Sequence, residues 1–349
     1  MKLLSRAALT RLGIFSIILG VILGWGWFTT IRMPFSSYRR QLPPLNQQQI
    51  SLEKALHQDV EILSGKLGEH NFSNYKNLVV AANYLESSLA SAGYKVKRQT
   101  YKLGKYNYDN IEVEIPGSNR KDEIVVIGGH YDSVIDSPGA NDNATGAAAV
   151  LELARALAGK KPARTLRFVE FVNEEPPFFQ TADMGSVVYA KRSHKAGEKI
   201  VAMLSLETMG YYSDEPGTQK YPFPLNLVYP SSGNFIGFIG NIKSGDLVRE
   251  AIASFRRHVQ FPSEGAALPA QIPGVGWSDQ WSFWQEGYPG IMVTDTAPYR
   301  YPYYHTAQDT IDKINFDRLA RVVAGLESVI GDLAGIEIDE PVEQTRVDF

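Results

Sequence analysis

The residues best suited to chemistry in this 349-residue chain are imidazoles and carboxylates at or just beyond the ends of apolar runs. They are His130, Asp132, Asp142, Glu174, Glu175, Glu207 and His305. Two metal ions about 3.5 to 4 Å apart need a carboxylate that bridges them and roughly two further ligands each. Two histidines and three carboxylates meet that need, and a further carboxylate is left for proton transfer. The set therefore meets the ligand count of a two-metal site.

A buried strand and a buried helix are predicted to position the first of these groups. Residues 125–127 are Val-Val-Ile, bounded by Gly128 and Gly129, which predicts a central strand that ends at His130. Small and apolar residues over 144–157 predict a helix packed closely on that strand, with Asp142 in the connecting loop. In open α/β sheets the loops that leave the strand ends converge at one edge, so we expect the ligands to meet there.

The remaining pattern predicts an α/β domain whose mixed β-sheet is flanked by helices. Helices are expected over 52–64, 75–92, 245–258 and 316–335. Strands are expected over 94–101, 110–115, 165–173, 200–206, 225–228, 235–240 and 290–294, whereas 263–275 is expected to be a loop.

The composition excludes several classes of function. The chain has no cysteine, which excludes disulfides, thiolate metal ligands and a cysteine nucleophile. Any metal must therefore be held by His, Asp and Glu. The formal net charge is −3 and no basic block is present, so nucleic-acid binding is not expected. No internal repeat divides the chain, which is long enough to bury one large core.

The amino-terminal segment differs from the rest in composition. A run without charge from residue 12 to 28 follows three basic residues, and Trp25 and Trp27 lie near its outer end, where interfacial indoles prefer to lie. This predicts a short basic segment over 1–11 and a membrane anchor over 12–31. The alternative is a cleaved signal peptide, because the run is short for a span and Gly24-Trp25-Gly26 is a weak small-x-small site.

The expected topology and organisation follow from that anchor. We favour an amino terminus in the cytoplasm and a single-pass protein with its catalytic domain on the non-cytoplasmic side, secreted or periplasmic if the segment is cleaved. Residues 32–49 are rich in Pro, Ser, Gln and Arg and are expected to form a stalk. The folded domain is expected over 50–335, followed by an acidic tail over 336–349.

Five motifs together resemble the M28 family of zinc exopeptidases, the aminopeptidase-type co-catalytic metallopeptidases. They are His130-Tyr-Asp132, Gly139-Ala-Asn-Asp-Asn-Ala-Thr-Gly146, Asn173-Glu-Glu175, Leu206-Glu-Thr-Met-Gly-Tyr211 and Tyr304-His-Thr-Ala-Gln-Asp-Thr310. They occur in the order of the family, and the opening helices with Tyr94 are similar to its entry segment. The resemblance thus covers nearly all of the chain between the anchor and the tail.

The resemblance implies two Zn²⁺ ions per chain and a role for each ligand. It implies that His130 and Glu175 hold one ion, that Glu207 and His305 hold the other, and that Asp142 bridges them. It further implies a cis peptide bond between Asp142 and Asn143, and Glu174 as general base. Water shared by two Zn²⁺ ions has its pKa lowered towards about 7. A metal-bridging hydroxide would then attack a terminal peptide bond, with Glu174 transferring the proton.

Two further residues have expected roles beside plainer alternatives. Asp132 is expected to accept the second ring N–H of His130 and fix its tautomer, although a turn-forming aspartate would look the same. Tyr304 matches a family tyrosine that donates to the developing oxyanion, although a cluster of packing tyrosines is the alternative. The other histidines are expected to be surface or satisfied residues, and most of Trp277, Trp281, Phe283 and Trp284 are expected to pack in the core.

Three hypotheses remain for the function. The first is a membrane-tethered di-zinc exopeptidase acting on peptides, most simply an aminopeptidase. Glu207 stands where many such aminopeptidases have aspartate, which leaves a carboxypeptidase direction open. The second hypothesis is a glutaminyl-cyclase-like acyltransferase with one zinc, which would not use all five ligands. The third is an inactive receptor or scaffold, whose sequence would lack a ligand or the base, and none is missing.

Overall fold

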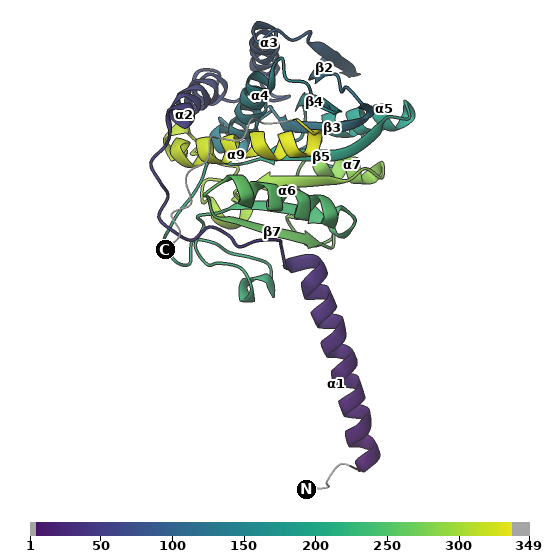
Figure 1. Cartoon of the computed structure of the whole chain (residues 1–349). Coiled ribbons are helices and arrows are strands. Elements are labelled where there is room, and N and C mark those ends of the chain that lie inside the picture. Colours follow the sequence, from purple (N-terminus) through teal and green to yellow (C-terminus); the bar gives the residue numbers. More distant parts are fainter. Residues whose placement is uncertain (1–4, 337–349) are drawn as a thin grey trace.

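An eight-stranded mixed sheet forms the centre of the computed structural model, which describes residues 5–336 (Figure 1). Its strands are β1 Lys97–Leu103, β2 Tyr106–Ile115, β3 Arg120–His130, β4 Arg164–Phe171, β5 Lys199–Glu207, β6 Ile236–Asn241, β7 Ser263–Leu268 and β8 Gly290–Thr294. They lie in the order β1-β2-β4-β3-β5-β8-β6-β7. The central strands β4, β3, β5 and β8 are parallel to one another, and β2 and β6 flank them antiparallel.

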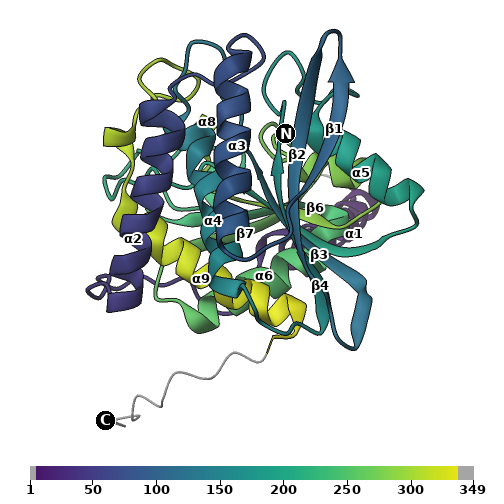
Figure 2. The same cartoon turned by 90° about the horizontal axis from the view of Figure 1, so that it is seen from above.

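Helices cover both faces of this sheet (Figure 2). They are α2 Gln47–Val60, α3 Tyr75–Ser91, α4 Thr145–Leu157, α5 Gly185–Lys195, α6 Gly245–His258, α7 Gln280–Gln285, α8 Ala297–Arg300 and α9 Phe316–Ala334. Buried side chains of α2, α3, α4, α6 and α9 share one hydrophobic cluster with the sheet, and those of α5 and α7 share another. The predicted fold class, a mixed sheet flanked by helices, is confirmed.

The strand β3 shows why the central run was readable in the sequence. Val125 and Ile127 belong to the first cluster and Val126 to the second, and all three are fully buried. A strand with helices on both faces has no polar face, so its residues form a continuous apolar run. This run ends at His130, the last residue of β3.

Two segments differ from the sequence-based expectation. Residues 225–228 do not form a strand, because a short 3₁₀ turn, Leu225–Leu227, follows Pro222 and Pro224. The strand β7 lies where a loop was expected. At Gly265 an added Cβ would lie 2.9 Å from atoms of both Ile252 and Met33. The small residues of β7 therefore reflect close packing rather than a turn.

The segment expected to be a stalk is folded against the domain. The helix α2 already begins within 32–49. Met33 packs against the hydrophobic core, and the Arg256 guanidinium on α6 donates to the carbonyls of Pro34 and Phe35, each at 2.9 Å. The chain between the amino-terminal helix and α2 is thus attached to the sheet edge at β7 and to α6, instead of being a free linker.

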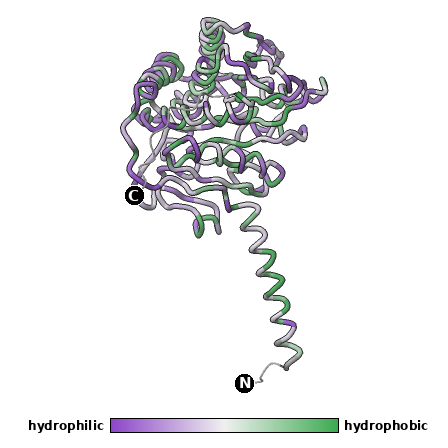
Figure 3. Tube along the Cα trace, in the orientation of Figure 1, coloured by the Kyte–Doolittle hydropathy of each residue, from purple (hydrophilic) through white to green (hydrophobic). Residues whose placement is uncertain are grey.

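The amino-terminal helix α1 (Arg6–Gly26) continues through a π-helical segment, Trp27–Ile31, and leaves the domain on the side of β7 (Figure 1). It is apolar over most of its length (Figure 3). Thr10–Ile31 is long and apolar enough to cross a membrane, and its most apolar part is not buried in the protein. A membrane span and a signal sequence both have these properties. Lys2 in the basic segment and residues 337–349 of the acidic tail lie outside the described residues.

Candidate active site

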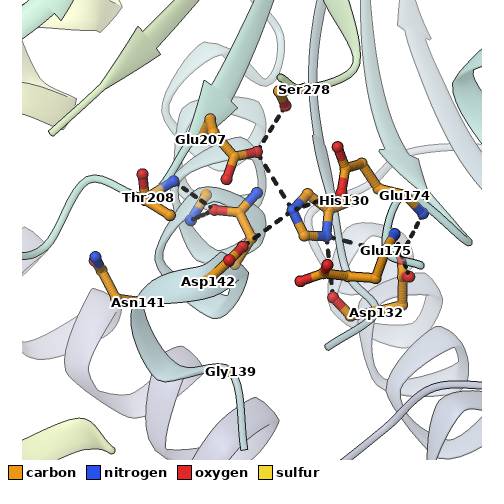
Figure 4. Close-up of polar contacts among 12 residues, drawn as sticks. His130, Asp132, Gly139, Asn141, Asp142, Glu174, Glu175, Glu207, Thr208 and Ser278 are labelled. Carbon is orange, nitrogen blue, oxygen red and sulfur yellow. Dashed lines mark hydrogen bonds and ion pairs between the residues drawn. The ribbon is translucent and has the colours of Figure 1, made fainter. Parts of the chain in front are cut away.

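The predicted ligands come together at one edge of the sheet (Figure 4). His130 ends β3 and Glu207 ends β5, and these two strands are parallel neighbours. Loops supply the others: Asp142 after β3, Glu174 and Glu175 after β4, and His305 between α8 and α9. The carboxyl ends of parallel strands meet at one edge, which is where ligands bind in open α/β sheets.

Two groups of three ligands share Asp142. In the first, Nε2 of His130 lies 3.3 Å from Oδ1 of Asp142 and 3.3 Å from Oε2 of Glu207. In the second, Nε2 of His305 lies 3.1 Å from Oδ2 of Asp142 and 3.4 Å from Oε2 of Glu175. Within each group the ligand atoms all lie within 4.8 Å of one another. Each group has the size of a metal site, and the two oxygens of Asp142 point to different groups.

This grouping corrects the pairing implied by the sequence, which joined His130 to Glu175 and Glu207 to His305. The strand register explains the difference. Gly128 on β3 pairs with Ser205 on β5, so His130 and Glu207 lie level on neighbouring strands. Glu175 lies several residues beyond the end of β4 and reaches the loop that carries His305.

The carboxylate of Asp132 accepts hydrogen bonds from the segment after β4 and lies farther from His130. Its two carboxylate oxygens accept the backbone N–H groups of Glu174 at 3.0 Å and Glu175 at 3.1 Å. Nδ1 of His130 lies 3.0 Å from the backbone carbonyl of Asp132 and 3.8 Å from its carboxylate. The tautomer of His130 is therefore set by the carbonyl, because the ring N–H donates to the nearer oxygen. This is a different use of Asp132 from the expected one.

Glu174 stands apart from both ligand groups. Its Oε2 lies 3.8 Å from Nε2 of His130, and its side chain is buried. Burial raises the pKa of Glu174 well above its usual range, and the negative charges of Glu175 and Glu207 raise it further. A cation bound nearby would lower that pKa again, since positive charge favours the carboxylate. A buried carboxylate poised in this way is suited to accept and return a proton.

The loop that carries Asp142 is held by a carboxylate to which the sequence analysis gave no role. Oδ1 of Asp309 accepts the backbone N–H of Asn141 at 2.8 Å, and Oδ2 accepts that of Asp142 at 3.0 Å. Tyr301 also donates to Asp309, at 2.7 Å. The sequence did contain a signal for this role, because Asp309 belongs to the motif 304–310, which also contains His305. A second missed contact is the hydroxyl of Ser278, which donates to Glu207 at 2.6 Å.

The amide of Asn143 joins the same loop to the end of β5. Its Nδ2 donates to the carbonyl of Leu206 at 2.9 Å, and its Oδ1 accepts the backbone N–H of Thr208 at 2.9 Å and of Gly146 at 3.1 Å. An added Cβ at Gly146 would lie 2.3 Å from both Asn143 Oδ1 and the Leu206 carbonyl, so only glycine fits. The peptide bond between Asp142 and Asn143 is cis, as predicted.

A small apolar cavity of about 90 Å³ adjoins the ligands. Glu207 and Tyr304 line it together with aromatic and aliphatic side chains. The ring of Tyr304 stacks on His305 with centroids 3.8 Å apart, and burial raises the pKa of Tyr304 well above its usual range. Its hydroxyl therefore remains a hydrogen-bond donor at neutral pH. Trp277 also lines the cavity and is 43% exposed, whereas Phe283 is fully buried in the core.

The charge of the site fits divalent cations. Asp142, Glu174, Glu175 and Glu207 are buried together, and within residues 5–336 their only ion-pair partners are His130 and His305. Oε1 of Glu175 is buried and has no hydrogen-bond partner among the described residues. Four buried carboxylates that share two imidazole partners are costly unless they coordinate metal ions. Imidazole nitrogen and carboxylate oxygen are ligands that Zn²⁺ accepts.

The remaining histidines take no part in the site. His70 is buried, and its Nδ1 lies 2.6 Å from the carbonyl of Gly68, so its polar group is satisfied. His57, His194 and His258 are exposed. The expectation that these residues are surface or satisfied histidines is confirmed.

Comparisons with known proteins agree with this geometry. The model of peptidase family M28 matches residues 110–330. The uncharacterized protein YfbL of Escherichia coli K12 is 34% identical over 284 residues, which are 79% of this chain and 86% of that protein. A zinc aminopeptidase from Bacillus subtilis has a similar fold, with a TM-score of 0.65 and 15% identity over 87% of this chain and 98% of that one.

A glutaminyl cyclase from Porphyromonas gingivalis is similar in fold as well, with a TM-score of 0.60 and 17% identity over 80% of this chain and 98% of that one. Fold alone therefore does not separate peptide hydrolysis from cyclisation. The family model, in contrast, spans most of the sheet and all five motifs. The chain belongs to peptidase family M28, and by family it is a zinc metallopeptidase.

Proposed function

We propose that this protein is a membrane-tethered aminopeptidase that uses two Zn²⁺ ions to remove the amino-terminal residue of peptides. The observation that carries the proposal is the pair of ligand groups that share Asp142, with Glu174 buried beside them as a separate carboxylate. A one-zinc, glutaminyl-cyclase-like reaction would leave one complete group unused. An inactive scaffold would have no need for four buried carboxylates that share two histidines as ion-pair partners.

The ligands are assigned from the measured groups. His130 and Glu207 would hold one ion, Glu175 and His305 the other, and Asp142 would bridge them. When bound, the two ions would polarise the scissile carbonyl and lower the pKa of water to near neutrality. The ligands stay in place because Asp309 holds the Asp142 loop and Asp132 holds the backbone of Glu175.

Proton transfer is assigned to Glu174. Its carboxylate would take a proton from the attacking water and return it to the amine that leaves. The carboxylate of Asp132 accepts the backbone N–H of Glu174 and so fixes the main chain that carries the base. Tyr304 would donate a hydrogen bond to the oxyanion that develops at the carbonyl. Its position beside His305 and at the cavity supports that role.

The cavity supports removal of residues from the amino-terminal end of a peptide. A carboxypeptidase must bind a free α-carboxylate, for which Arg or Lys is the usual partner. Among the described residues that line the cavity, the charged side chains are Glu207 and Glu264, and none is basic. A wall without a basic side chain favours a free α-amine over a free α-carboxylate. The apolar remainder of the wall favours an apolar first residue.

The amino-terminal helix supports a membrane tether. Thr10–Ile31 has the length and composition of a span, and its last residues are attached to the domain. We propose that α1 remains as a single-pass anchor, with the catalytic domain on the non-cytoplasmic side. The three basic residues that precede the apolar run are nearly balanced by Arg32, Arg39 and Arg40 beyond it, so the charge rule favours this orientation only slightly.

The two adjacent glutamates give a direct test. Glu174→Gln should retain both metal ions, while the catalytic step slows by about 10²- to 10⁴-fold. Glu175→Gln should lose one ion as well as activity. The matched control is Glu215→Gln, because Glu215 is exposed and lies away from the site.

Metal stoichiometry is measured on each purified variant. Turnover is measured with one peptide whose amino terminus is blocked and with one whose carboxyl terminus is blocked. Release from the first peptide alone would contradict the aminopeptidase direction. Wild-type turnover by Glu174→Gln, or loss of metal by that variant alone, would contradict the assignment of the pair.

A further inference from the structure

The loop 221–229 has two apolar faces. Its inward side chains form part of the wall of the cavity beside the ligands: Tyr221, Pro222, Leu225 and Tyr229. Its outward side chains are also apolar and are exposed: Phe223 81%, Leu227 71% and Val228 41%. An exposed apolar group of this kind on a soluble surface marks a contact with a protein, a ligand or a membrane.

The same loop and the end of the amino-terminal helix pack against one hydrophobic cluster. Ile31, at the end of the π-helical segment, and Leu225 and Tyr229 of the loop all pack against the cluster that contains Ala266 and Leu268 of β7. The Arg249 guanidinium on α6 donates to the carbonyl of Thr29 at 2.7 Å and fixes that end of the helix to the domain. In Figure 1 the loop lies below β7, on the side where α1 leaves and level with its last turns.

The chemistry around the loop matches a bilayer surface. Trp27 and Phe28 are exposed at the end of the apolar run, where aromatic rings prefer the interface between lipid and water. Arg32 and Lys220 are exposed next to the helix end and the loop, and basic side chains there favour anionic headgroups. A membrane holding α1 would therefore meet apolar and basic side chains of the loop at the same depth.

We propose that the loop 221–229 rests in the interfacial layer of the membrane that holds α1. This inference rests on the proposed tether. Because the same loop forms the wall of the cavity, the cavity then opens close to the bilayer surface. Peptides whose first residue is apolar concentrate at that surface, so they would be the preferred substrates. The occupant of the exposed face is lipid, and a second copy of the chain is the alternative that the experiment separates.

The absence of cysteine makes a site-specific test direct. The full-length chain is reconstituted in lipid nanodiscs at one or two copies per disc and carries an environment-sensitive fluorophore on one introduced cysteine. Phe223→Cys and Leu227→Cys report on the loop. Val80→Cys is the matched control, because Val80 is apolar and 41% exposed on α3, on the far side of the domain from α1. Ile18→Cys reports on the helix itself.

Quenching is measured with nitroxides attached near the headgroup end of the lipid chains and with iodide in the water. The inference requires that labels at 223 and 227 be quenched by lipid several-fold more than the label at 80, and by iodide less. If Ile18 is quenched by lipid while 223 and 227 behave like 80, the loop contact is refuted and the tether stands. If Ile18 is not quenched by lipid, both fail. Loop labels shielded from both quenchers would refute the lipid contact in favour of a protein contact.

Discussion

Asp309→Asn tests whether the metal site depends on a residue that touches neither ion nor substrate. The carboxylate accepts three hydrogen bonds, from the backbone N–H groups of Asn141 and Asp142 and from Tyr301. An asparagine keeps one acceptor oxygen and turns an N–H₂ group towards one of those donors. One charge-assisted hydrogen bond is lost, at about 1.5 to 3 kcal/mol, and the others become neutral.

The expected cost is therefore about 3 kcal/mol. Part of it will appear as a lower free energy of unfolding and part as a misplaced Asp142. Since about 1.4 kcal/mol is a factor of ten in a binding constant, metal affinity should fall by about 10- to 100-fold, in the range usual for groups that orient ligands. Tyr301→Phe removes one donor only and should cost about 1 kcal/mol.

Metal affinity is measured by competition with a chelator, and stability by thermal unfolding with and without Zn²⁺. The matched control is Asp136→Asn, because Asp136 is exposed and its φ of 64° suits asparagine equally well. If Asp309→Asn unfolds earlier but binds metal with wild-type affinity, the carboxylate stabilises the fold without positioning the ligand. Wild-type values for both quantities would refute the reasoning altogether.

Three further predictions concern the same edge of the sheet. Asp132→Asn leaves one of the Glu174 and Glu175 backbone N–H groups without its acceptor, so turnover should fall by about 10- to 100-fold and the ion beside Glu175 should bind more weakly; weaker binding of the ion beside His130 alone would show that Asp132 acts mainly through His130. Gly146→Ala forces a Cβ to 2.3 Å from a backbone carbonyl and should lower the free energy of unfolding by about 3 kcal/mol or more. The control Gly65→Ala, whose Cβ would meet only Glu61 at 3.5 Å, should change that free energy by less than about 1 kcal/mol. Equal effects of the two variants in chemical denaturation would contradict the packing argument. Chelation should lower the melting temperature, because each ion at 100 times its Kd contributes about 2.7 kcal/mol to the folded state, and Zn²⁺ should restore it; an unchanged melting temperature would mean that the site does not bind metal tightly.

The parts of the fold that could be predicted are those with a local signature. The run 125–127 is apolar because β3 is buried on both faces. The position of His130 could be predicted because it ends the strand that contains this run. β7 could not be predicted in the same way. Its Gly-Ala-Ala segment has small side chains, and at Gly265 Ile252 and Met33, from distant parts of the chain, leave no space for a Cβ. The local sequence does not indicate that packing.

The same distinction applies to the site. The candidate ligands could be chosen from motifs, but their grouping depends on strand register, which sets His130 level with Glu207. Asp309 and Ser278 hold ligands from positions far along the chain, at separations that no spacing rule covers. The sequence also failed to indicate that 32–49 packs on α6 instead of forming a stalk.

The two ligand groups differ in how they are held, and this difference bears on metal exchange. His130 and Glu207 are both strand ends, and both are buried within the sheet edge. His305 lies in an exposed loop with 32% of its side chain accessible, and its φ of 56° is in the left-handed region, which few non-glycine residues adopt. Its ring stacks on Tyr304. A rigid, enclosed group binds its ion with little reorganisation, whereas the loop group must order His305 as it binds. If two ions are bound as proposed, the ion beside His130 should therefore exchange more slowly than the ion beside His305, because the His305 side chain is accessible to solvent.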